Sequence, residues 1–181
     1  MALSRRVEPT LTGYFGEAPP DLLPADWQGM DCRSLEIDIG CHKGGFLIEM
    51  AQQYPISNFL GVERQRGRVE RAKRKIALLG LSNARVLHGE GLDILGALPD
   101  ACADCIHVLF PDPWPKRRHK SRRLVQQQFL LEVQRVLKLE GFARLVTDDP
   151  DYAREIEFVA ASIVAFMTLS LQLLMNGGIL K

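Results

Sequence analysis

Short apolar runs alternate with amphipathic stretches along most of this chain. Runs such as LEIDI, FLGV and CIHVLF are typical of strands that are covered on both faces. The stretches between them repeat apolar residues at the three- and four-residue spacing of helices. The pattern predicts strands at 35–39, 58–63, 84–88, 104–110 and 141–147, and helices at 43–53, 67–79, 92–98, 121–138 and 150–167.

Strands that alternate with helices indicate βαβ units, which form a parallel sheet with right-handed crossovers. We therefore predict an α/β fold with a mostly parallel twisted sheet flanked by helices. Residues 1–30 are rich in proline and glycine and are predicted to form an irregular N-terminal arm, while residues 31–181 form one domain. Ligands of such sheets bind beyond the carboxyl ends of the strands. The loops that follow the strands are therefore the first places to look for a site.

The composition is that of a globular domain. The 181 residues are 46% hydrophobic and carry a formal net charge of +1, which excludes a disordered chain. The longest apolar stretch, near 158–167, is shorter than the roughly 20 residues that span a bilayer, and the first residues lack the apolar run of a secretory signal. The four cysteines are interpreted as reduced thiols. We therefore predict a cytoplasmic protein without a membrane partner.

The near-neutral net charge conceals two dense basic segments. Residues 64–75 hold seven Lys or Arg and one acid, and residues 116–123 hold six Lys or Arg and no acid, so 13 of the 23 basic residues lie in these two segments. Solvated helix faces would account for ordinary charge runs. Two runs this dense in a neutral protein favour a polyanionic partner.

Acidic residues follow the first three predicted strands. Asp38 stands before a glycine-rich loop whose spacing does not match the dinucleotide pattern G-x-G-x-x-G, and a carboxylate there suits a cationic ligand better than a pyrophosphate. Glu63 ends the second strand, where an acid accepts hydrogen bonds from ribose hydroxyls at both NAD and S-adenosylmethionine sites. Glu90 could accept from the exocyclic amine of a base. A tight turn and ordinary surface acids are the alternative interpretation.

The loop after the fourth predicted strand, FPDPWPKRRHK, is the most informative segment. Its prolines stiffen the backbone and hold Asp112 and Trp114 beside a basic run. A carboxylate, an aromatic face and cations together resemble the parts of a purine-in-RNA site; a rigid turn whose Trp114 caps the core is the alternative. Thr147 and Asp148 follow the fifth strand, where an N-cap role competes with a ligand role.

Histidine and cysteine residues give no metal-site pattern. Cys102 and Cys105 have the C-x-x-C spacing, but no second pair lies nearby in the sequence. His88 and His107 fall within predicted strands and are interpreted as core or edge residues. We therefore predict no metal site.

Taken together, these residues resemble the tRNA (guanine-N7-)-methyltransferase family. The resemblance runs from about Leu35 to Tyr152 and rests on LEIDIGCHKGGFL, FLGVE, FPDPWPKRRHKSRRLVQ and LVTDDPDYA. It implies a Rossmann-like enzyme that transfers a methyl group from S-adenosylmethionine to N7 of a guanine in the tRNA variable loop.

The resemblance also implies roles for individual residues. It assigns Asp38, Gly40, Glu63 and Glu90 to the cofactor, and it makes Asp112 the catalytic or guanine-binding acid. It assigns Lys116, Thr147 and Asp148 to the substrate.

Two departures from the family pattern change these expectations. His42 replaces the usual glycine of the cofactor loop, and the last residues show nothing like the family's T-x-F-E-x-[KR] motif. We therefore expect a C-terminally truncated domain whose sheet lacks its last strands. A weak or inactive RNA-binding remnant and a nucleotide-dependent oxidoreductase remain as alternatives, and a monomer and a homodimer are both compatible with the sequence.

Overall fold

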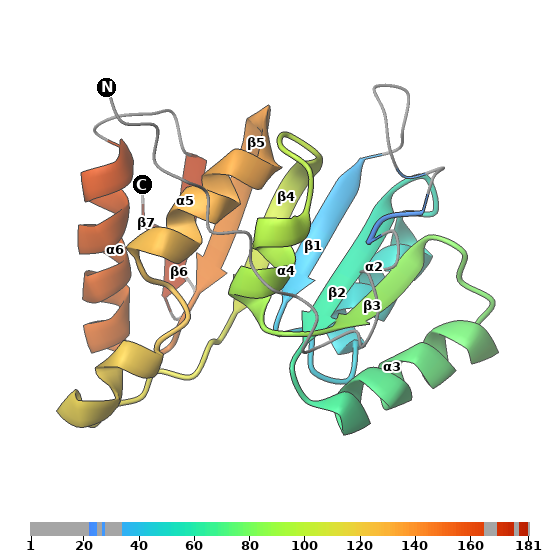
Figure 1. The fold of residues 1–181 in the computed structure, drawn as a ribbon, viewed down its shortest axis with the longest axis horizontal. Coiled ribbons are helices and arrows are strands. Elements are labelled where there is room, and N and C mark those ends of the chain that lie inside the picture. The colour runs from blue at the N-terminus through green and yellow to red at the C-terminus, as the bar shows by residue number, and fades with distance from the viewer. Residues whose placement is uncertain (1–21, 25–26, 28–33, 165–169, 176–177, 181) are drawn as a thin grey trace.

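A computed structural model describes the chain except for residues 1–21, 25–26, 28–33, 165–169, 176–177 and 181 (Figure 1). The elements alternate as predicted. They are β1 (Leu35–Ile39), α2 (Gly45–Gln53), β2 (Asn58–Glu63), α3 (Arg66–Leu78), β3 (Ala84–His88), α4 (Gly91–Ala97), β4 (Ala103–Leu109), the 3-10 helix η2 (Arg117–Arg122), α5 (Gln127–Val136), β5 (Leu137–Val146), α6 (Pro150–Val164), β6 (Ser170–Met175) and β7 (Gly178–Leu180).

The strands form one sheet in the order β3-β2-β1-β4-β5-β6-β7. All neighbours from β3 to β6 are parallel, and β7 is antiparallel to β6. The chain order reverses between β1 and β4, so the carboxyl ends of these two strands mark the switch point where ligands of open α/β sheets bind. The predicted parallel α/β fold is confirmed.

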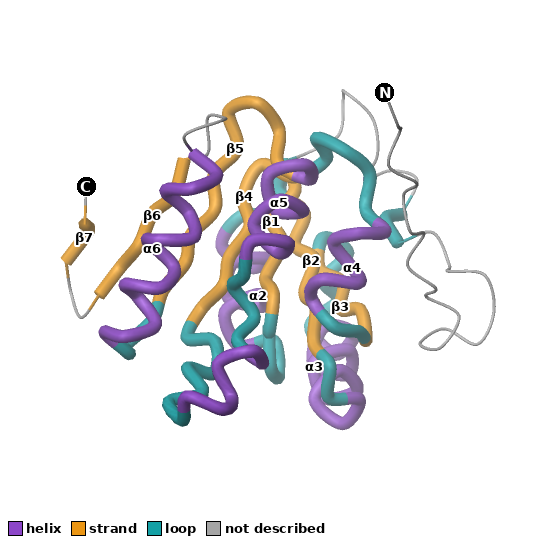
Figure 2. Tube along the Cα trace, turned by 60° about the vertical axis from the view of Figure 1, so that its left-hand side comes forward, coloured by secondary structure: helices purple, strands orange, loops and turns teal. Residues whose placement is uncertain are grey.

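Helices cover both faces of the sheet. Figure 2 shows α4, α5 and α6 on one face and α2 and α3 on the other. The larger apolar cluster lies on the α4–α6 side, and Leu22, Leu23 and Trp27 are buried in it. Short pieces of the predicted N-terminal arm therefore belong to the core, while most of that arm lies outside the described residues.

The expectation that the sheet lacks its last strands is wrong. Two further strands, β6 and β7, follow α6 and extend the sheet beyond β5. The segment SLQLLM alternates polar and apolar residues only at its start. Because alternation is the main sequence signal of a half-buried strand, the signal here is weak.

The predicted helix at 121–138 is also wrong in its extent. Residues 117–122 form η2, Arg123 and Gln126 are extended, and α5 begins only at Gln127. The Gln126 amide donates to the carbonyl oxygens of Ser121 and Arg123, both at 2.9 Å, and so holds the turn between the two helices. At the other end β5 begins at Leu137.

Gly141 permits the irregular pairing at the start of β5. The register between β4 and β5 shifts between Ala103 and Cys105, and a Cβ at Gly141 would stand 3.1 Å from the carbonyl oxygens of Ala103 and Asp104. A side chain would force these backbones apart, so glycine allows the long β5 to stay paired with β4.

Candidate active site

A cleft of about 440 Å³ opens at the switch point, beyond the carboxyl ends of β1, β2, β3 and β4. This volume lies within the range of small-molecule and cofactor sites. The cleft brings together four of the eight predicted site residues, namely Gly40, Glu63, Glu90 and Asp112, and also Trp114. The other four predicted residues, Asp38, Lys116, Thr147 and Asp148, are not among its lining residues.

Glu63 is the most firmly fixed acid of the cleft. Its side chain is 3% exposed. One carboxylate oxygen accepts from the backbone N–H of His42 at 3.0 Å, and the other accepts from the backbone N–H of Gln65 at 2.8 Å. Arg68 adds a longer ion pair at 3.7 Å. The remaining lone pairs of this carboxylate are therefore held in place before any ligand arrives, as an acceptor for hydroxyl groups requires.

Asp38 is buried and is not among the lining residues of the cleft. Its carboxyl is buried, and burial, aided by the negative charge of Glu63, raises its pKa from 3.8 to about 7. Gly40, two residues on, lines the cleft with φ +82°, and no heavy atom lies within 4 Å of where its Cβ would be. The loop thus exposes bare backbone to the cleft.

His42 stands where the resemblance implies glycine. It lines the cleft, its side chain is exposed, and its φ of 55° is left-handed. Only glycine adopts this conformation without cost. The turn that carries the His42 N–H to Glu63 therefore retains the backbone geometry of a glycine loop despite the imidazole.

Arg64 is a cleft residue that the sequence patterns did not single out. They place it only within a basic segment, but its guanidinium lies 3.9 Å from both Glu90 and Asp112 and so stands between acids from two different loops. All three side chains are about half exposed or more, so these contacts are weak. Its position directly after Glu63, at the end of β2, was the available signal.

The loop from Phe110 to Pro115 presents Trp114 to the cleft. Phe110 and Trp114 both have positive φ, which turns the proline-stiffened chain sharply after β4. The Trp114 indole meets the His119 ring edge to face at 5.7 Å between centroids, and the Arg122 guanidinium lies 5.2 Å from the indole centroid. Trp114 therefore lines the cleft beside two basic side chains instead of capping the core.

Thr147, Asp148 and Lys116 lie outside this cleft. Thr147 is buried and its hydroxyl accepts from the backbone N–H of Asp149 at 3.2 Å. Asp149 is the residue that caps α6, since its carboxylate accepts from the backbone N–H of Tyr152 at 2.7 Å. Asp148 and Lys116 are exposed, so both remain accessible to a large substrate.

One cation of the second basic segment is not available to a polyanion. Arg123 is buried, with a side chain that is 1% exposed, and it is paired with Glu155. The prediction that the whole 116–123 segment holds phosphates is therefore wrong at this residue.

Glu36, Cys105 and His107 form a separate polar group on β1 and β4. His107 Nε2 is 2.7 Å from a Glu36 carboxylate oxygen and 3.4 Å from the Cys105 sulfur. The first distance is that of a direct hydrogen bond. Burial, aided by the charge of Glu36, raises the pKa of the Cys105 thiol to about 12, and burial also raises the pKa of Cys41. Both thiols are therefore protonated and unreactive at neutral pH.

Comparison with known proteins places the fold and the cleft in a family. A family model described as "Putative methyltransferase" matches residues 33–179. The chain belongs to this methyltransferase family. The structure of a SAM dependent methyltransferase from Aquifex aeolicus superposes with a TM-score of 0.58 over 71% of this chain and 70% of its own, at 21% identity. That similarity shows a shared fold.

The names of related proteins state a more specific activity. A tRNA (guanine-N(7)-)-methyltransferase from Nitrosococcus oceani is 37% identical over 74% of this chain and 57% of its own length. One from Geobacillus kaustophilus is 35% identical over 77% of this chain and 64% of its own length. The chain thus spans about three fifths of the length of these relatives. Within the described residues, no helix is both long enough and apolar enough to cross a membrane.

Proposed function

We propose that this methyltransferase domain transfers the methyl group of S-adenosylmethionine to N7 of a guanine in the tRNA variable loop. The observation that carries the proposal is one cleft at the switch point that combines the anchored Glu63 with Asp112 and Trp114. The names of the relatives, tRNA (guanine-N(7)-)-methyltransferase, support the choice of acceptor. Because tRNA, the proposed substrate, is cytoplasmic, the proposal includes a cytoplasmic location.

The cleft fits an adenosyl cofactor. Glu63 offers carboxylate lone pairs for two ribose hydroxyls, and the bare backbone at Gly40 lets a ligand approach closely. Ile39 and Val62 supply apolar wall, and Glu90 offers an acceptor for the amine of the base. Glu63 and Glu90 also place negative charge near a ligand whose sulfonium and ammonium groups are positive. These residues would hold the cofactor, which supplies an electrophilic methyl group.

The acceptor needs positioning more than activation. Guanine N7 carries an exposed lone pair and no proton, so no general base is required. Correct orientation of two reactants contributes up to about 7–11 kcal/mol in ideal cases. We assign Asp112 to orienting the guanine through its N–H donors and to offsetting the positive charge that develops on the base. Trp114 provides an aromatic face on which a splayed base can stack.

The remaining contacts are assigned to the RNA. The exposed cations of 66–75 and 116–122 flank the cleft, with α3 and η2 at the lower edge of the molecule in Figure 1. Lys116, which follows the 110–115 loop, and Asp148, which follows β5, are both exposed. Thr147 shapes the turn that carries Asp148. A folded tRNA seated over this edge would place its phosphates against the cations and one guanine in the cleft.

The test is methylation of an unmodified tRNA transcript with labelled S-adenosylmethionine, followed by nucleoside analysis for 7-methylguanosine. We expect label in 7-methylguanosine, and none in a transcript that carries 7-deazaguanosine, which lacks the acceptor atom. Replacing single variable-loop guanines identifies the site. Cofactor binding without transfer, or RNA binding without cofactor binding, would instead point to an inactive remnant of the family.

Asp112→Ala tests the assigned residue. We expect methyl transfer to fall at least tenfold while cofactor affinity changes little, because Asp112 is assigned to the guanine. Glu157→Ala on α6 is the matched control, since this acid is exposed and has no part in the proposal. Unaltered turnover in Asp112→Ala would remove Asp112 from its role.

A further inference from the structure

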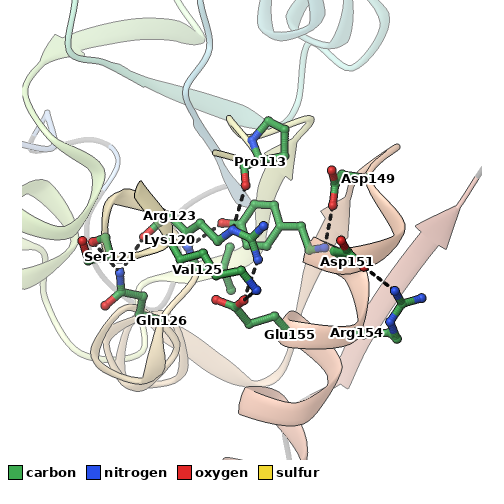
Figure 3. A network of polar contacts seen from close by, with 11 residues as sticks. Pro113, Lys120, Ser121, Arg123, Val125, Gln126, Asp149, Asp151, Arg154 and Glu155 are labelled. Atoms are coloured by element: carbon green, nitrogen blue, oxygen red, sulfur yellow. Dashed lines mark hydrogen bonds and ion pairs between the residues drawn. The ribbon is translucent and has the colours of Figure 1, made fainter. Parts of the chain in front are cut away.

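Arg123 is the one cation of the two basic segments that lies almost entirely buried among the described residues. Burying a guanidinium is unfavourable unless its charge is paired and its N–H groups are hydrogen-bonded. Here Nε donates to the carbonyl oxygen of Pro113 at 2.7 Å, and a terminal nitrogen donates to a Glu155 carboxylate oxygen at 2.5 Å. Figure 3 shows Arg123 between these two partners.

The same guanidinium also lies over an aromatic ring. It lies 4.6 Å from the centroid of the Tyr152 ring. The Tyr152 hydroxyl in turn accepts from the backbone N–H of Val125 at 2.9 Å. Tyr152 is fully buried and is held at its own backbone by the Asp149 cap of α6. The anchored ring therefore helps to hold the guanidinium of Arg123 in place.

These contacts join three separate parts of the fold. Pro113 belongs to the loop after β4, Arg123 and Val125 belong to the turn between η2 and α5, and Glu155 and Tyr152 belong to α6. Pro113 stands between Asp112 and Trp114, the two residues of that loop to which we assign the guanine. Its carbonyl is therefore the point at which the loop is fastened to the helical layer.

Resting on the function proposed above, we infer that Arg123 is a positioning residue that locks the Asp112–Trp114 segment in the geometry that receives the guanine. The other arginines and lysines of its segment are exposed and can meet RNA. The task requires arginine, because two donors at fixed angles and a stacking plane are used at once. Lysine would keep the charge and lose both the fork and the plane.

Arg123→Lys is the diagnostic variant, and Arg154→Lys on α6 is its matched control, since Arg154 is exposed and pairs with the equally exposed Asp151. We expect Arg123→Lys to lower kcat for tRNA methylation at least tenfold while the cofactor Kd stays within twofold. Glu155→Gln, a milder change at the same guanidinium, is expected to lower kcat less. Arg154→Lys is expected to leave both quantities unchanged.

A readout without turnover separates this inference from the proposed function. In a Trp27→Phe background, Trp114 is the only tryptophan of the chain. Quenching of its fluorescence by acrylamide then reports how accessible and mobile the indole is. We expect the quenching constant to rise at least twofold in Arg123→Lys and not in Arg154→Lys. If the chain methylates no tRNA but the quenching constant rises, the positioning role of Arg123 is supported and the proposed function is wrong. If Arg123→Lys changes neither quenching nor kcat, the lock is wrong.

Discussion

Three acids at the carboxyl ends of β1, β2 and β4 differ in their surroundings, and this difference sets what each can do. Glu63 is anchored by two backbone N–H groups, Asp112 is largely exposed, and Asp38 is buried. Ionising Asp38 therefore carries a large desolvation cost, and that cost has a measurable consequence for stability.

We predict that Asp38 makes the protein less stable as the pH rises from about 4 to about 7. Its folded-state pKa of about 7 lies above the ordinary value of 3.8, so the folded state binds more protons in this window and loses that advantage as the pH rises through it. A difference of one unit between the folded-state and unfolded-state pKa changes the free energy of unfolding by up to about 1.4 kcal/mol. Urea unfolding of Asp38→Asn should lack this decline, and parallel pH profiles for the two proteins would contradict the assignment.

We predict that His42 strains the backbone of its loop and lowers the affinity for the cofactor. His42→Gly removes the left-handed strain, which is about 1 kcal/mol for a non-glycine residue, and keeps the backbone N–H that donates to Glu63. We expect tighter binding of S-adenosylmethionine by calorimetry. His42→Ala, which loses the imidazole but keeps the strain, separates the two effects. Weaker binding by His42→Gly would identify the imidazole as a genuine contact.

Among the elements, α6 is preceded by two adjacent acids that have separate tasks. Asp149 caps the helix, whereas Asp148 is exposed and assigned to RNA. We predict that Asp149→Ala lowers the free energy of unfolding by about 1 kcal/mol and that Asp148→Ala changes it by less than about 0.5 kcal/mol. Urea unfolding measures both. A larger loss for Asp148→Ala would mean that this acid, too, serves the fold.

The first three strands, β1, β2 and β3, could be predicted well because they are short, mostly buried runs between helices of clear period. The prediction of helix boundaries failed where local side-chain contacts override the helical spacing of apolar residues. The side-chain amide of Gln126 and the buried Arg123 break one expected helix into η2 and α5. In the site, motif spacing located the loops. The position of Arg64 at the end of β2 could mark it as a cleft residue, but its placement between Glu90 and Asp112 depends on three loops at once and could not be predicted from any one of them.

For the molecule as a whole, near-zero net charge conceals a division of labour among its cations. Arg123 is committed to the fold, and Arg64 and Arg68 face acids of the cleft. Exposed cations on α3 and η2 remain on both flanks of the carboxyl edge. If tRNA spans that edge, cations from both flanks must neutralise phosphates in the same complex.

Salt dependence tests this arrangement. Each neutralised phosphate contributes about 0.7–0.9 to the slope of log K against log salt concentration. We predict that Arg71→Gln with Lys73→Gln on α3, and Arg117→Gln with Arg118→Gln on η2, each flatten the slope for tRNA by about one to two. Arg154→Gln, on the exposed face of α6, should leave the slope unchanged. An effect confined to η2 would mean that the RNA is seated on the Trp114 side of the cleft alone, and that α3 carries its charge for solubility rather than for binding.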